Sequence, residues 1–250
     1  MDDWIIETRG LGKVFRGFTA VEGLDLKIGR GTIHALIGPN GAGKTTVFNL
    51  LTKFLEPSAG RIFFNGRDIT LLRPAEIARR GIGRSFQISA VFPHLPARDN
   101  VRVALQRKLG GSFQFWRSGR VLGRLAARAD ALLDAVGLAG LGDVAASELS
   151  YGRKRALEIA TTLALDPELL LLDEPMSGLG REDILRISAL IRRVAADRTI
   201  LMVEHNLSVV ADLSHRITVL ARGQILAEGD YATVATAPEV VEAYMGTGDA

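Results

Sequence analysis

The stretch GPNGAGKTT, residues 38–46, is the strongest indicator of fold class in the chain. It satisfies the pattern G-x-x-x-x-G-K-[ST] and lies between a β-rich segment, TIHALI (32–37), and a helical pattern that starts at KTTVFNLL. In that context the glycines let backbone N–H groups turn inward around phosphate oxygens, and the helix N-terminus adds partial positive charge. The stretch therefore predicts a phosphate-binding loop (P-loop). The alternative is a glycine-rich turn that matches the pattern by chance.

The loop motif also assigns chemistry to individual side chains. Lys44 is expected to reach the β- and γ-phosphates, and the Thr45 hydroxyl is expected to bind Mg²⁺. The predicted phosphate-binding residues are Gly38, Pro39, Asn40, Gly41, Ala42, Gly43, Lys44, Thr45 and Thr46. The expected ligand is ATP with Mg²⁺.

Strand and helix patterns alternate on both sides of the loop. ELLLLDEP (168–175) and TILMVEH (199–205) are apolar runs of strand length, as expected for strands buried on both faces. REDILRISALIRRVAADR (181–198) carries the apolar stripe of an amphipathic helix. GRIFFNG (60–66) ends in an Asn-Gly turn, and RITVLARGQILAEGD (216–230) resembles a hairpin. The prediction is an α/β P-loop NTPase core with a mainly parallel sheet and an antiparallel β portion.

The pattern becomes mostly helical between the two halves of this core. Leu122, Leu125 and Ala129 follow helical spacing, and glycines then punctuate the chain. We therefore expect one domain over residues 1–250, with a core made of 1–87 and 166–250. The segment 88–165 is expected to be a helical lobe inserted into that core.

Composition excludes several classes of protein. The net charge of +3 is too small to indicate nucleic-acid binding by itself, and the absence of cysteine excludes disulfides and thiolate zinc sites. The start, MDDWIIE, lacks the basic and apolar regions of a secretory signal. No apolar run reaches the ~18 residues that a membrane span needs. The composition favours a soluble intracellular chain.

Two adjacent carboxylates follow the apolar run LLLLDEP. Ligands bind at the carboxyl ends of strands in open α/β sheets, so Asp173 and Glu174 are expected to lie beside the phosphates. Mg²⁺ prefers oxygen ligands, which favours Asp173 as its partner, through water. Glu174 then remains to orient and deprotonate the attacking water. The alternative for such a pair is the ordinary start of a loop.

Two further polar residues are candidates on weaker grounds. His205 ends a predicted core strand, where it could contact the γ-phosphate or hold Glu174, or simply cap the strand. Gln87 has a neutral amide that could bind Mg²⁺ or orient water, although its spacing would also suit a surface glutamine.

A second anion-binding helix start lies about a hundred residues after the P-loop. In ELSYGRKRALEIA (148–160), a serine and a glycine precede an apolar helical pattern. Ser150 supplies a hydroxyl and an N-cap, and Gly152 permits close backbone approach. The residues themselves do not say whose phosphate this segment binds.

These motifs together resemble the nucleotide-binding subunit of an ATP-binding-cassette (ABC) transporter. The resemblance rests on GPNGAGKTT, Gln87, LSYGRKR, LLLLDEP and His205, in this order over essentially the whole chain. It implies that Phe15 stacks on adenine, although a core phenylalanine is the alternative. It also implies that Ser150 and Gly152 bind the γ-phosphate held by a second cassette, in a homodimer or heterodimer. The loop around Gln87 would meet the membrane subunit.

Within the family, LSYG, VEHN and the ending PEVVEAYMG resemble the ATPase subunits of branched-chain amino acid, urea and amide importers. This branch implies integral membrane permease subunits, a periplasmic binding protein acting indirectly, no nucleic acid, and a peripheral position at the cytoplasmic face of the inner membrane. The alternatives are a lipopolysaccharide-export ATPase subunit and a soluble ABC-type assembly factor. Three positions depart from the common family pattern: Tyr151, Arg153 and Gly180. The last two leave open how strongly two such sites are coupled.

A basic run and an aromatic group lie in the expected helical lobe. Arg117, Arg120, Arg124 and Arg128 fall at helical spacing. Such a run is usually a solvated face, and the alternative is contact with anionic lipid or with a loop of the membrane subunit. The nearby aromatic residues, which could be core or an exposed docking patch, are Phe113, Phe115 and Trp116.

Overall fold

Strands and helices alternate along most of the chain, as the sequence predicts. The computed structural model describes residues 3–85, 91–107 and 119–245. Its strands are β1 (Trp4–Phe15), β2 (Phe18–Leu24), β3 (Lys27–Gly29), β4 (Ile33–Ile37), β5 (Ala59–Phe64), β6 (Arg67–Asp68), β7 (Ile82–Ser85), β8 (Leu169–Asp173), β9 (Thr199–Val203), β10 (Arg216–Ala221) and β11 (Gln224–Gly229). Its helices are α1 (Lys44–Leu51), α2 (Pro74–Arg80), α3 (Ala97–Gln106), α4 (Gly119–Ala135), α5 (Tyr151–Leu163), α6 (Arg181–Ala195), α7 (Leu207–Leu213), α8 (Tyr231–Ala235) and α9 (Pro238–Met245), with a 3-10 turn at Ala146–Glu148.

The centre of the molecule is a six-stranded sheet in the order β11-β10-β4-β9-β8-β7. All neighbouring pairs are parallel except the β10–β11 hairpin at one edge. Strand β8 shows why its sequence is a continuous apolar run. Leu169 and Leu171 belong to one hydrophobic cluster, whereas Leu170 and Leu172 belong to the other, on the opposite face. Both faces of the strand are covered, so both sets of alternating residues are apolar.

A smaller antiparallel sheet packs beside the first and confirms the predicted antiparallel portion. Its strands run in the order β2-β1-β5-β6, and β3 pairs with β1. Helix α1 lies between the sheets, since Phe48 shares one hydrophobic cluster with Ile5 of β1 and Leu36 of β4. The predicted β10–β11 turn is confirmed by positive φ angles at Arg222 and Gly223.

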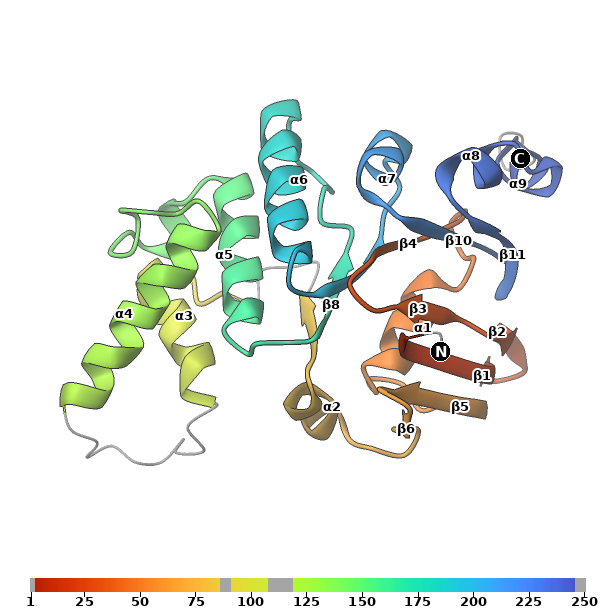
Figure 1. Ribbon diagram of the computed structural model, residues 1–250, viewed down its shortest axis with the longest axis horizontal. Helices are drawn as coiled ribbons and strands as arrows, with labels where there is room; N and C mark the ends of the chain where they lie inside the picture. The colour runs from red at the N-terminus through yellow and green to blue at the C-terminus, as the bar shows by residue number, and fades with distance from the viewer. Residues whose placement is uncertain (1–2, 86–90, 108–118, 246–250) are drawn as a thin grey trace.

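Helices α3, α4 and α5 gather at the end of the molecule opposite the antiparallel sheet (Figure 1). Their apolar faces do not form a separate core. Val101 of α3 and Leu133 of α4 belong to the same hydrophobic cluster as Leu170 and Met202 of the central sheet. The fold therefore matches the predicted class: a P-loop core, a mainly parallel sheet, an antiparallel portion and a helical insertion.

The direction of the parallel strands positions the functional residues. Strands β4, β8 and β9 are adjacent and parallel, so the loops that follow them emerge at one edge of the sheet. In the described residues, no helix is both long and apolar enough to span a bilayer.

Candidate nucleotide-binding site

The P-loop turns sharply between β4 and α1, and two of its glycines are required by the backbone. Gly38 has a φ of 145°, and a Cβ at that position would overlap the carbonyl oxygen of Leu220. Gly43 has a φ of 102°, and its Cβ would lie 2.7 Å from the carbonyl oxygen of Ala20. Both conformations are strained for residues with side chains. The predicted loop is therefore formed as the motif requires.

Lys44 begins α1 and folds back over the loop. Its Nζ donates to the carbonyl oxygens of Gly38 at 2.6 Å and Pro39 at 2.9 Å. Burial lowers the pKa of Lys44, and the nearby charge of Glu174 raises it in part. The ammonium group is thus largely removed from water and held by the loop's own carbonyl oxygens.

A pocket of about 360 Å³ collects most of the predicted site residues. It is lined by Phe15, Phe18, Ala20, Asn40, Gly41, Ala42, Gly43, Lys44, Thr45, Thr46, Glu174 and His205. Gly38 and Pro39 are not among the lining residues. The pocket joins a phosphate-binding loop to two aromatic rings and a carboxylate, although these come from distant parts of the chain.

Phe18 was not predicted, and the β1–β2 hairpin explains its presence. Phe15 and Phe18 are paired across the hairpin, and the turn between them has positive φ at Arg16 and Gly17. Both rings are exposed, Phe15 by 39% and Phe18 by 67%. The sequence signal was available, since two phenylalanines flank an Arg-Gly turn. The exposure of Phe15 excludes the alternative of a core phenylalanine.

The two adjacent carboxylates point to different partners. Glu174 has a φ of 46°, and its Oε1 lies 2.8 Å from Nε2 of His205 in the pocket. Asp173 is buried, and its Oδ2 accepts a 2.6 Å hydrogen bond from Nη2 of Arg84. The backbone turn at Glu174 separates the neighbouring side chains. The structure therefore brings Glu174 and His205 together, whereas Asp173 is buried and is not among the residues that line the pocket.

Glu204 organises the loop that carries His205, a role that sequence reasoning missed. Its Oε1 accepts from the N–H of Met176 at 2.8 Å, and its Oε2 accepts from the N–H groups of His205 and Asn206. Burial raises the pKa of Glu204. A charged residue at the end of the apolar run TILMV was the available signal, because a buried carboxylate needs such donors.

Arg155, the last residue of LSYGRKR, has a role that sequence reasoning missed. It lies in α5 and is buried, and its guanidinium donates to the backbone carbonyls of Asp173, Glu174 and Pro175. Nη1 also pairs with Glu158 at 2.8 Å. The side chain thus holds the turn in which Glu174 has its positive φ, a conformation that is uncommon for residues other than glycine.

The segment LSYGRKR forms the predicted helix start. Ser150 is the N-cap of α5, and its Oγ accepts a 3.4 Å hydrogen bond from the N–H of Arg153. A Cβ at Gly152 would lie 2.5 Å from both carboxylate oxygens of Asp183 in α6, so this glycine allows the two helices to approach. Ser150 and Gly152 do not line the pocket that contains the P-loop.

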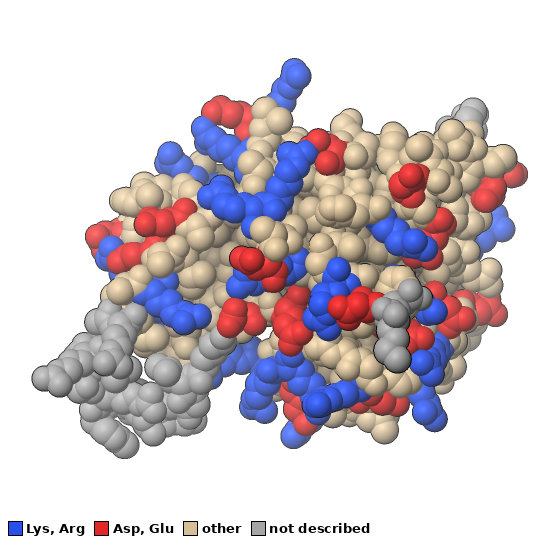
Figure 2. Space-filling view, in the orientation of Figure 1, with Lys and Arg blue, Asp and Glu red and all other residues tan. Residues whose placement is uncertain are grey.

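Basic and acidic side chains both lie near this helix start. Several Lys and Arg side chains project around α6 on the face shown in Figure 2, with acidic side chains beside them. A second pocket, of about 350 Å³, lies here between α5 and α6. Its lining includes Gly152, Arg153, Asp183, Arg186 and Arg193.

Several predicted positions lie outside the described residues. These are Gln87, Phe113, Phe115, Trp116 and Arg117, together with the side chains of Arg120 and Arg124. Of the basic run in the helical lobe, the side chain of Arg128 is described, and it is exposed.

Comparison with known proteins supplies the family. A sequence profile described as ABC transporter matches residues 21–177. The chain belongs to the ABC transporter family. It is similar to the high-affinity branched-chain amino acid transport ATP-binding protein BraF of Pseudomonas aeruginosa, with 37% identity over 97% of this chain and 98% of that protein. The family assignment makes the chain an ATP-binding subunit that hydrolyses ATP for transport.

Two solved structures share the fold. The ADP conformation of an ATP-binding cassette of an ABC transporter superimposes with a TM-score of 0.86 and is 30% identical, covering 97% of this chain and 99% of that one. A bacterial ABC transporter cassette described as dimeric has a TM-score of 0.77 and 25% identity, covering 90% of this chain and 98% of that one. ATP-binding subunits of this family work with partner cassettes and permeases.

Proposed function

We propose that the pocket around the P-loop binds ATP and that Glu174 activates the water that attacks the γ-phosphate. The observation that supports this most directly is the arrival of Phe15, the P-loop, Glu174 and His205 at one pocket. The two exposed phenylalanine rings offer a stacking surface for adenine. The loop N–H groups, Lys44 and the N-terminus of α1 offer positive charge for the phosphates. The aromatic rings thus suit the adenine ring, and the P-loop suits the polyphosphate.

The carboxylate of Glu174 is the proposed general base. Its Oε1 is held by His205, which fixes the direction of the carboxylate, and the Arg155 contacts fix its backbone. A general base must lie within hydrogen-bond reach of the proton that it removes. The contacts with His205 and Arg155 restrict the Glu174 carboxylate to one orientation, as this role requires. His205 is then a positioning residue for Glu174 and a proposed donor to the γ-phosphate. We also propose that Gln87 binds Mg²⁺ or orients the attacking water.

The oxygen donors near the loop fit Mg²⁺. This cation is usually held by one or two protein oxygens together with substrate phosphates. The Thr45 hydroxyl lines the pocket, and the Asp173 carboxylate ends the neighbouring strand β8. When bound, Mg²⁺ would neutralise part of the phosphate charge. Thr45, Asp173 and Gln87 are the proposed residues that hold it.

We propose that Ser150 and Gly152 bind the γ-phosphate of a second cassette. Neither residue lines the pocket of its own chain, yet the N-terminus of α5 is capped by Ser150, and the neighbouring pocket contains Arg153 and Arg186 together with Asp183. The partial positive charge of a helix N-terminus suits an anion. Two cassettes arranged head to tail would bring this helix start to the partner's pocket.

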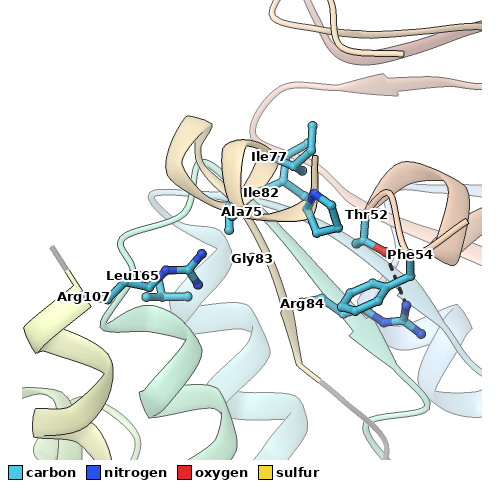
Figure 3. A pocket seen from close by; sticks show the side chains of 11 residues that line it. Thr52, Phe54, Ala75, Ile77, Ile82, Gly83, Arg84, Arg107 and Leu165 are labelled. Atoms are coloured by element: carbon cyan, nitrogen blue, oxygen red, sulfur yellow. Dashed lines mark hydrogen bonds between the residues drawn. The ribbon is translucent and has the colours of Figure 1, made fainter. Parts of the chain in front are cut away.

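The permease is proposed to dock in a groove between the core and the helical lobe. The groove lies at the end of β7, directly before residues 86–90, and has apolar walls that include Phe54, Ile77 and Leu165 (Figure 3). This arrangement supports a single functional unit over 1–250, with a core of 1–87 and 166–250 and a lobe of 88–165. It also supports a peripheral position at the cytoplasmic face of the membrane, with the periplasmic binding protein acting through the permease.

The proposed cargo is a branched-chain amino acid. The support is the similarity to BraF over nearly the full length of both chains. Deleting the gene should therefore abolish high-affinity uptake of labelled leucine, isoleucine and valine and leave lipopolysaccharide transport unchanged. The opposite pattern would assign the chain to the export branch. Copurification without any permease would favour a soluble assembly factor.

The ATP site is tested with Lys44→Ala. Charge-assisted hydrogen bonds contribute about 1.5–3 kcal/mol, so ATP affinity should fall about 10- to 100-fold in titration calorimetry. Lys53→Ala is the matched control, because Lys53 is equally buried but lies outside the pocket. Unchanged ATP binding in a folded Lys44→Ala protein would contradict the site.

A further inference from the structure

Arg84 of β7 joins three elements through one buried guanidinium group. Its Nη2 donates to Oδ2 of Asp173 at 2.6 Å, and its Nη1 donates to Oδ1 of Asn49 at 2.6 Å. The Arg84 side chain is 8% exposed and that of Asp173 is 5% exposed. Nη1 also lies 3.4 Å from the Thr52 hydroxyl, the contact drawn as a dashed line in Figure 3. The sequence provided no reason to single out this arginine.

The same side chain forms part of the wall of the groove. The groove has a volume of about 250 Å³, and its lining includes Thr52 and Phe54 after α1, Ala75 of α2, and Arg84. Figure 3 shows Arg84 beside Phe54 and Thr52 on one side, with Arg107 and Leu165 on the other. One side chain therefore contacts both the groove and the carboxylate proposed to hold Mg²⁺.

Asp173 is held by two arginines, one at its carboxylate and one at its backbone carbonyl. Arg84 holds its carboxylate, while Nη2 of Arg155 donates to its backbone carbonyl at 3.1 Å. The backbone is fixed from α5, so a movement of Arg84 would turn the carboxylate relative to a stationary strand end. The planar guanidinium is itself held at its other nitrogen by Asn49, so it directs the Asp173 carboxylate more tightly than a flexible ammonium group would.

We propose that Arg84 is a positioning residue that orients Asp173 for Mg²⁺ and links this orientation to occupancy of the groove. The inference rests on the proposed function, in which Asp173 holds the metal and the permease fills the groove. It adds that a single side chain, Arg84, directly connects the Asp173 carboxylate to the groove. A segment that enters the groove and displaces Arg84 would change how well the site binds Mg²⁺–ATP.

The orienting role is tested by the gain in ATP affinity that Mg²⁺ produces. ATP binding is measured by calorimetry in EDTA and in Mg²⁺ for the wild type, Arg84→Met, Arg84→Lys and Asn49→Ala. Loss of a partner that orients a metal ligand typically lowers metal affinity about 10- to 100-fold, so the gain should fall by this factor in Arg84→Met. It should fall less in Arg84→Lys and in Asn49→Ala, which frees the other end of the guanidinium. Affinity in EDTA should stay unchanged.

Arg98→Met is the matched control, because Arg98 pairs with Asp130 within the helical lobe. It should leave the Mg²⁺-dependent gain unchanged. A full gain in folded Arg84→Met would overturn the orienting role. A wild type without any Mg²⁺-dependent gain would instead contradict the proposed metal site and not the inference about Arg84.

The link to the groove is tested by filling it. The chain contains no cysteine, so Ala75→Cys provides a single attachment point for a bulky maleimide on the exposed wall of the groove. The label should change the Mg²⁺-dependent gain in the wild-type background and have no effect with Arg84→Met. A labelled Ala127→Cys, on the exposed surface of α4, should have no effect in either. Equal effects of the groove label in both backgrounds, or no effect in either, would overturn the link.

Discussion

At the scale of single residues, buried polar groups determine what the neighbouring site residues do. Asp173 and Glu174 are adjacent, yet one pairs with Arg84 and the other with His205. The difference arises from the turn at Glu174, which Arg155 holds through the carbonyl oxygen. The backbone conformation at Glu174 therefore gives two consecutive carboxylates different partners.

The buried histidine ahead of the P-loop provides a prediction about pH. His34 of β4 is fully buried, and its Nε2 lies 2.8 Å from the Thr218 hydroxyl, which in turn donates to Glu228. Burial lowers the pKa of His34 from 6.5 to about 4; Glu228 raises it and Arg216 lowers it further. Below pH 6.5, His34 therefore becomes protonated in the unfolded chain but stays neutral in the folded chain until the pH approaches 4. The free energy of unfolding should fall as pH drops from 6.5 towards 4, by up to about 1.4 kcal/mol per pH unit.

Urea unfolding of the wild type and His34→Gln between pH 7.5 and 4.5 measures this effect. Their difference in unfolding free energy should shift against the wild type below pH 6.5. Glu204 acts in the opposite sense, because its raised pKa makes the folded state gain stability as pH falls. It is present in both proteins and cancels in the difference. A difference that is constant with pH would contradict the prediction.

At the scale of elements, the meeting of α5 and α6 requires a residue without a side chain. Gly152 lies in the first turn of α5, directly against the Asp183 carboxylate of α6. The Tyr151 ring lies beside Gly178, in the loop between Glu174 and α6, with Cε1 3.3 Å from where a Cβ on that glycine would be. The helix start proposed to bind a partner's phosphate is therefore packed against its own chain's loop after β8.

A double-mutant cycle tests the packing at Gly152. Alanine favours a helix over glycine by up to about 1 kcal/mol, but overpacking typically costs about 1–3 kcal/mol. Gly152→Ala should therefore be neutral or destabilising by about 1 kcal/mol in the wild-type background. In an Asp183→Ala background, the same change should stabilise the protein by up to about 1 kcal/mol. Thermal or urea unfolding measures both. If the sign is the same in both backgrounds, Asp183 is not the constraint.

At the scale of the whole molecule, we propose that one chain carries halves of two different sites. Its P-loop pocket contains no residue from LSYGRKR, while the helix that carries this segment holds the Glu174 turn through Arg155. A phosphate bound at Ser150 by a second cassette would thus lie at the end of a helix that supports the first cassette's base. This arrangement is consistent with two nucleotide sites whose states depend on one another.

Dimer formation with ATP is the corresponding prediction. Loss of a general base lowers the rate about 10²- to 10⁴-fold, and Glu174→Gln also removes a charge that repels the γ-phosphate. Glu174→Gln should therefore bind ATP, turn over slowly and accumulate as a dimer in sedimentation with MgATP. Adding Ser150→Arg should return it to monomer, whereas Ala127→Arg on the exposed surface of α4 should not. If the Glu174→Gln cassette did not dimerise with MgATP even in the presence of its copurified permease, the head-to-tail arrangement would be excluded.

The sequence by itself determined the features that depend on local pattern. The P-loop, the apolar strands β8 and β9, the α6 stripe, the β10–β11 turn and the Ser150 N-cap follow from residues within a few positions of each other. Backbone geometry and short-range periodicity act over such distances, so these predictions needed no knowledge of the fold. The carboxyl ends of parallel strands then placed Glu174 and His205 correctly at one edge.

Only the tertiary structure decided which distant side chains complete the site. Arg84 meets Asp173 across 89 positions of sequence, and Met176 meets Glu204 across 28. The local pattern around Arg84 is that of an ordinary surface arginine, and Arg155 ends the motif LSYGRKR without a role of its own in the sequence. Both are buried because folding brings an acidic partner to each. Burial of a charge is acceptable only where folding provides that partner. The partners come from other elements, so their identity depends on how the sheet, α1 and α5 pack.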